Sequence, residues 1–129
     1  MTKRANSYIP PVDLSRLKRI ASETKECLRE VVDYYVQVTK GQLQKLDRAV
    51  HLRSGTEVKT LAHSCIGAST LLGMRAIVIP LRQLEEIAVK KQWKGAATAL
   101  AEARKELEGM QSFLKMSKEG KEDAQSTDR

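Results

Sequence analysis

Apolar residues recur at spacings of three and four along four long stretches of the chain, at about residues 22–52, 54–73, 74–91 and 93–115. This spacing places them on one face of an α-helix, whereas a half-buried strand would repeat them at every second residue. Aromatic residues, which strands favour, make up only 4% of the chain. The sequence therefore predicts an all-α protein.

The boundaries of these stretches predict short connections between helices. Ser54, with Glu57 three residues later, forms a capping box at the start of the second stretch. Gly73 is expected to end that helix, and Pro80 is expected to bend the next one because proline removes a backbone donor. Four amphipathic helices with short connections favour an antiparallel four-helix bundle.

An additional short helix is predicted before the bundle, with Asp13 as its N-cap. Residues 1–11 are mostly polar and end in two prolines, so we expect an N-terminal tail there. Residues 117–129 contain a single apolar side chain, that of Ala124, and are predicted to be a disordered C-terminal tail. One helical domain is thus expected over residues 12–116.

The net charge of +7 at pH 7 favours association with an acidic partner. The basic residues are spread along the chain and few aromatic residues accompany them, so we do not expect nucleic-acid binding. A basic adaptor for nucleic acid or an acidic membrane surface stays open as an alternative of another class. No membrane insertion is predicted, because the run AIVIPL at 76–81 is far shorter than the ~20 residues of a membrane span.

Both cysteines, Cys27 and Cys65, fall at apolar helical positions, where a free thiol behaves as a small hydrophobic residue. The basic start of the chain is not followed by the apolar stretch of a secretory signal. These two features predict a cytoplasmic protein.

One histidine, His63, lies in the apolar stretch LAHSCIGASTLLGM at residues 61–74. Because successive helix residues turn by about 100°, His63 points about 140° away from Val58, which belongs to the inward stripe. Gly67 follows one turn later, although glycine within a helix costs about 1 kcal/mol relative to alanine. The sequence therefore predicts an outward imidazole beside a position that leaves space for an approaching partner.

Residues 63–73, HSCIGASTLLG, resemble the motif H-x-x-K-G-S-S-x-x-L-G of histidine-containing phosphotransfer (HPt) domains. The resemblance extends over about residues 25–115. It implies that His63 accepts a phosphoryl group from the aspartate of a receiver domain and passes it to another receiver domain, with a hybrid sensor kinase upstream. The chain would then be a phosphoryl carrier rather than a complete enzyme, without a cofactor of its own, and Mg²⁺ would belong to the receiver domain.

The chain departs from this motif at Ile66, where the family usually has a lysine that is thought to steady the phosphoryl group. Lys59 lies one turn before His63 on the same outward side, so we expect it to supply the missing charge. The departure also keeps an alternative open, in which the chain is a pseudo-HPt module that docks receiver domains or a kinase without carrying phosphate.

The resemblance further implies that a side chain of the following helix orients the imidazole, and Gln83 and Glu85 are both candidates. Docking of a partner requires a partly apolar patch around the nucleophile. We expect four residues to form it, namely Ile66, Gly67, Thr70 and Met74. No metal site is predicted, because His63 and Cys65 point about 200° apart on one helix and cannot share an ion.

Overall fold

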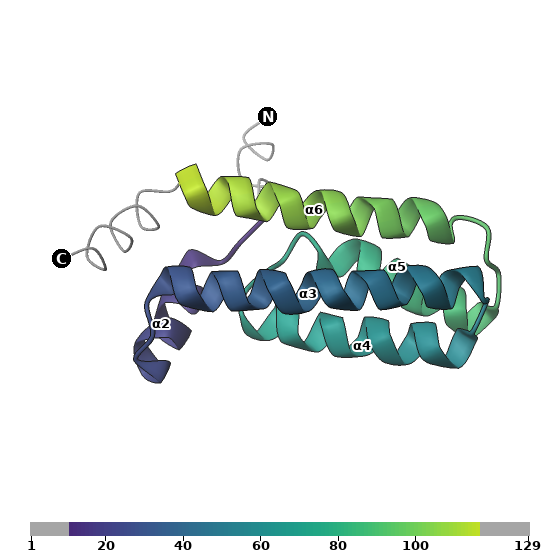
Figure 1. Ribbon diagram of the computed structural model, residues 1–129, viewed down its shortest axis with the longest axis horizontal. Helices are drawn as coiled ribbons and strands as arrows, with labels where there is room; N and C mark the ends of the chain where they lie inside the picture. Colours follow the sequence, from purple (N-terminus) through teal and green to yellow (C-terminus); the bar gives the residue numbers. More distant parts are fainter. Residues whose placement is uncertain (1–10, 117–129) are drawn as a thin grey trace, which may run out of the picture.

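The computed structural model describes residues 11–116, which form helices joined by short connections and no strand, apart from one isolated bridge between Val12 and Met74. The helices are α2 (Leu14–Thr24), α3 (Leu28–His51), α4 (Gly55–Leu71), α5 (Val78–Lys90) and α6 (Ala96–Met116). Helices α3 to α6 form an antiparallel bundle in which α6 returns to α3, and α2 lies at one end of it (Figure 1). The all-α prediction and the short additional helix are confirmed, whereas the two predicted tails fall almost entirely outside the described residues.

The N-caps predicted for α2 and α4, Asp13 and Ser54, are both observed. The Asp13 carboxylate accepts the Arg16 backbone N–H, and the Ser54 hydroxyl accepts the Glu57 backbone N–H, so each satisfies an amide that has no acceptor within its helix. The stretch expected to be helical from residue 22 is divided, because Lys25 adopts a left-handed conformation (φ 61°) that ends α2. Helix α3 therefore begins only at Leu28.

The prediction that Pro80 bends a helix running from residue 74 is wrong. Helix α5 begins at Val78, so Pro80 is its third residue. Amides of the first helical turn have no preceding carbonyl to bond, and a proline there removes nothing. Residues 74–77 instead form the connection in which Met74 pairs with Val12.

The core is lined by side chains from all five helices, and its largest fully buried members include Leu17, Leu46, Leu81, Leu84 and Met110. A small polar cluster lies within it, since the Tyr35 hydroxyl of α3 and the Ser69 hydroxyl of α4 are 2.6 Å apart and Thr39 of α3 is buried beside them. Burial raises the pKa of Tyr35 to about 12 and that of the Cys65 thiol to about 11. The inward face of α4 is therefore closed to water and uncharged at neutral pH.

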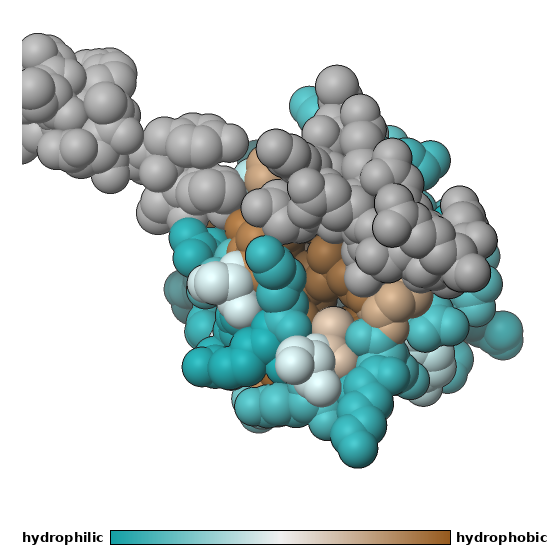
Figure 2. Space-filling model, turned by 90° about the vertical axis from the view of Figure 1, so that its left-hand side faces the viewer, coloured by the Kyte–Doolittle hydropathy of each residue, from teal (hydrophilic) through white to brown (hydrophobic). Residues whose placement is uncertain are grey.

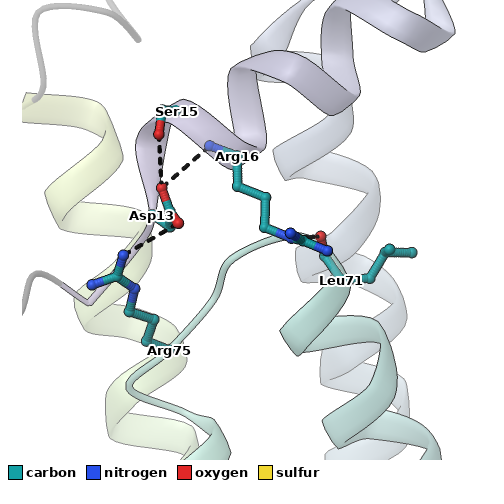
Figure 3. Close-up of polar contacts among 5 residues, drawn as sticks. All are labelled: Asp13, Ser15, Arg16, Leu71 and Arg75. Atoms are coloured by element: carbon teal, nitrogen blue, oxygen red, sulfur yellow. Dashed lines mark hydrogen bonds and ion pairs between the residues drawn. The ribbon is translucent and has the colours of Figure 1, made fainter.

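The N-terminal segment is bonded to the end of α4 (Figure 3). The Asp13 backbone N–H donates to Gly73 O at 2.7 Å, and Arg16 Nε donates to Leu71 O at 2.6 Å. Arg75 forms an ion pair with Asp13 at 3.2 Å. Gly73 is required here because its φ is +80° and a Cβ would lie 2.9 Å from Asp13 Cβ.

Figure 2 looks onto this end of the bundle and shows apolar surface at its centre with polar surface beside it. Single exposed apolar side chains are normal for a folded domain, and here they include Tyr34, Leu71 and Ile79. Among helices α2 to α6, none is long and apolar enough to cross a lipid bilayer.

Candidate functional site

His63 lies in the middle of α4 and points away from the bundle core. Its side chain is 78% exposed, whereas Ala62 and Cys65 on the same helix are fully buried. The buried residues anchor α4 to its neighbours, so the helical phase forces the imidazole outward. The orientation of His63 predicted from the sequence is confirmed.

A carboxylate of the next helix holds the imidazole. His63 Nδ1 lies 3.0 Å from Glu85 Oε2, and the Glu85 side chain is only 24% exposed. An ionised carboxylate can only accept a hydrogen bond, so Nδ1 carries the proton and donates it. In the neutral ring this leaves the lone pair on Nε2. The contact therefore selects one tautomer and limits rotation of the ring.

The other candidate for this contact, Gln83, makes no hydrogen bond with His63. It lies two residues before Glu85 on α5, which turns its side chain by about 200° around the helix. Gln83 is exposed on another face, and the structure brings only Glu85 to the imidazole.

Gly67, one turn after His63, is exposed and leaves open space. A Cβ added to it would have no atom within 4 Å, so the packing of this chain does not require glycine at that position. Gly41 in α3 and Gly109 in α6 are equally open, so open space alone does not indicate a site. What distinguishes Gly67 is its position next to an exposed imidazole.

Two residues expected in the docking patch are not available for docking. Ile66 is only 7% exposed and Met74 is fully buried, so neither presents a surface to a partner. Met74 is misplaced in the prediction because α4 ends at Leu71, and the helical phase does not continue beyond its end. Ile66 lies on the flank of α4 that packs into the core. Of the four predicted residues, Gly67 and Thr70 are exposed.

Lys59 is exposed one turn before His63, as its spacing predicts. Its ammonium makes no ion pair with any residue of the described range 11–116. The position allows the predicted role but does not test it.

A second cation near the site was not singled out from the sequence. Arg82 is exposed on α5, three residues before Glu85. It lines a surface hollow of about 430 Å³ together with Thr70, Arg16 and Arg75. The signal in the sequence is the segment RQLEE at 82–86, in which one helical turn separates the arginine from Glu85.

Within residues 11–116, no three His, Cys, Asp or Glu side chains gather in a way that could hold a metal ion. The site as described offers one exposed imidazole nitrogen, a carboxylate that orients it, and exposed cations about one turn away on α4 and on α5. Such a set can accept and release an electrophilic group that a second molecule brings.

Comparison with known proteins supports the fold assignment. No protein-family model and no curated protein sequence matches the chain. The crystal structure of histidine-containing phosphotransfer protein B (HptB) from Pseudomonas aeruginosa PAO1 superposes with a TM-score of 0.77 and 18% identity, over 92% of this chain and 98% of that one. The chain therefore has the fold of a histidine-containing phosphotransfer protein.

Proposed function

We propose that this protein is a phosphorelay intermediate, in which His63 accepts a phosphoryl group from the aspartate of a receiver domain and passes it to another receiver domain. The observation that carries the proposal is the exposed imidazole whose Nδ1 bonds Glu85 at 3.0 Å. The fold shared with a histidine-containing phosphotransfer protein supports it.

The tautomer held by Glu85 explains how the transfer would proceed. The Nε2 lone pair attacks the phosphorus of the acyl phosphate, the bond from phosphorus to the aspartate oxygen breaks, and the aspartate leaves as a carboxylate. The imidazole keeps its proton on Nδ1, so the ring becomes positively charged as the N–P bond forms. The Glu85 carboxylate stabilises this charge, and the reverse sequence delivers the phosphoryl group to the next aspartate.

In this proposal the receiver domain supplies the aspartate and Mg²⁺, while this chain supplies the nucleophile and its orientation. The chain is then a carrier rather than a complete enzyme. A hybrid sensor kinase would stand upstream of it, and the cytoplasm is the expected location.

One observation favours a second candidate function, a pseudo-HPt module that docks receiver domains or a kinase without carrying phosphate. Ile66 is buried and brings no charge to the site, at the position where the resemblance leads us to expect lysine.

Incubation with a phosphorylated receiver domain separates the two functions. We expect acid-labile label on the wild-type chain and none on His63→Gln. His51→Gln is a matched control, because His51 is the second histidine and its side chain is also 78% exposed. Binding of the receiver domain without any label on the wild type would instead support the docking module.

A further inference from the structure

We propose that Arg82 of α5 binds the phosphoryl group carried by His63 and supplies the positive charge that Ile66 cannot. This inference rests on the proposed function. A phosphoryl group adds about two negative charges, so a phosphorylated His63 places a concentrated anion at Nε2 on an exposed helix face. An anion of this kind is stabilised by a cation within hydrogen-bond distance.

The contact between His63 and Glu85 sets the register of the antiparallel helices α4 and α5. From that contact, Gly67 lies one turn further along α4, and Arg82 lies nearly one turn back along α5. Because the two helices run in opposite directions, Gly67 and Arg82 lie on the same side of the imidazole along the helix axes. Thr70 and Arg82 line one hollow, so side chains of α4 and α5 meet on this side of the imidazole.

Gly67 provides the space that the arginine needs. No atom lies within 4 Å of the position of its absent Cβ, so the surface at Gly67 is open. An arginine has a long, flexible stem that can lie along such a surface while its charged end stays in water. The guanidinium can therefore extend across Gly67 toward Nε2.

Three arginines line the hollow, and of these only Arg82 has a side chain without a partner among the described residues. Arg16 donates to Leu71 O, and Arg75 is paired with Asp13. The Arg82 side chain makes no hydrogen bond or ion pair with any residue between 11 and 116. A guanidinium presents parallel N–H donors that match two phosphoryl oxygens.

Lys59 lies on the opposite side of the imidazole along α4, one turn before His63. On α5 the residue one turn after Glu85, level with Lys59, is Val89, whose side chain has no hydrogen-bond donor. Arg82 therefore approaches the imidazole from the side of the open Gly67 position, whereas Lys59 lies on the other side. The two cations can be tested separately.

The experiment phosphorylates the purified full chain with phosphoramidate, a small donor that needs no receiver domain. Two quantities are measured for the wild type and for Arg82→Gln: the rate of label uptake on His63, and the pKa of the attached phosphoryl group from its ³¹P chemical shift. We expect Arg82→Gln to take up label on the order of tenfold more slowly. We also expect its phosphoryl pKa to rise by about half a unit, because a nearby cation favours the dianion.

Arg82→Lys should restore most of the uptake. Arg19→Gln, which removes an exposed arginine of α2, controls for the loss of one positive charge. If Arg82→Gln matches the wild type in both quantities, or if only Lys59→Gln changes them, the inference is overturned while His63 remains the carrier. A wild-type chain that takes no label on His63 would overturn the proposed function, and the inference with it.

Discussion

The two faces of α4 differ in what their polar side chains do. On the inner face, the Ser69 hydroxyl is fully buried and bonds Tyr35. On the outer face, His63 is held by one hydrogen bond on Nδ1, with its side chain 78% exposed. A buried polar group must be satisfied for the fold to be stable, whereas an exposed nucleophile needs an accessible lone pair. Stability and reactivity are therefore separable on this helix by substitution.

The largest effect on stability is expected from the inner face. Ser69→Ala should lower the free energy of unfolding by about 1.5 kcal/mol, because it removes one hydrogen-bond partner of the buried Tyr35 hydroxyl and leaves only Thr39. Urea denaturation measures this change. Label uptake on His63 should stay at the wild-type rate, and a large loss of uptake in a folded Ser69→Ala protein would show that the two faces are coupled.

Next to the outer face of α4, Glu85→Ala should slow label uptake while leaving stability nearly unchanged. Without the carboxylate, the imidazole loses its fixed tautomer and the charge that stabilises the phosphorylated ring, so we expect roughly tenfold slower uptake. Urea denaturation should show little change in stability. Glu86→Ala is the matched control, since the Glu86 carboxylate pairs with Lys90 rather than with the histidine. Equal uptake in the two variants would contradict the orienting role.

Alkaline pH should destabilise the inner face, where burial raises the pKa of both Cys65 and Tyr35. The raised pKa of Cys65, about 11, means that the folded chain keeps a proton that the unfolded chain releases above its ordinary value of 9.0. The stabilisation is therefore complete below pH 9 and is lost as the pH rises toward 11, by about 1 kcal/mol at pH 10. Denaturation at a series of pH values measures the slope, and Cys65→Ala should make it shallower. An unchanged slope would mean that the thiol does not contribute.

The smallest effect is expected at the open position beside the nucleophile. Gly67→Ala should raise the free energy of unfolding by somewhat less than 1 kcal/mol, because alanine favours the helix and its Cβ meets nothing. Gly109→Ala in α6 should stabilise the chain similarly. Only Gly67→Ala should slow transfer from a phosphorylated receiver domain, and equal transfer rates in the two variants would indicate that the space beside His63 is not used.

Much of the fold follows from helical periodicity and capping residues, which can be recognised in the sequence. Helical periodicity is a property of neighbouring residues, so the outward direction of His63 and the caps Asp13 and Ser54 could be read without coordinates. Helix ends were less predictable. Pro80 is compatible with either the first turn or a bend, and only the packing of residues 74–77 against the N-terminal segment decides between them.

Within the candidate site, features that depend on one helix could be predicted from the sequence, whereas features that depend on the packing of two helices could not. Spacing along α4 identified His63 and Gly67, but it misplaced Ile66 and Met74, because burial depends on which neighbours cover a residue at the edge of a stripe. Whether Gln83 or Glu85 meets the imidazole depends on how α5 is rotated against α4. The position of Arg82 relative to the imidazole depends on the same rotation.

By itself, the sequence determined that the chain is helical and that one histidine faces water, since both depend on the regular turn of a single helix. Only the tertiary structure decided which carboxylate orients that histidine and which arginine of α5 shares a hollow with Thr70 of α4. Those pairings join residues of two different helices. They are set by the packing of whole helices, which local spacing does not encode.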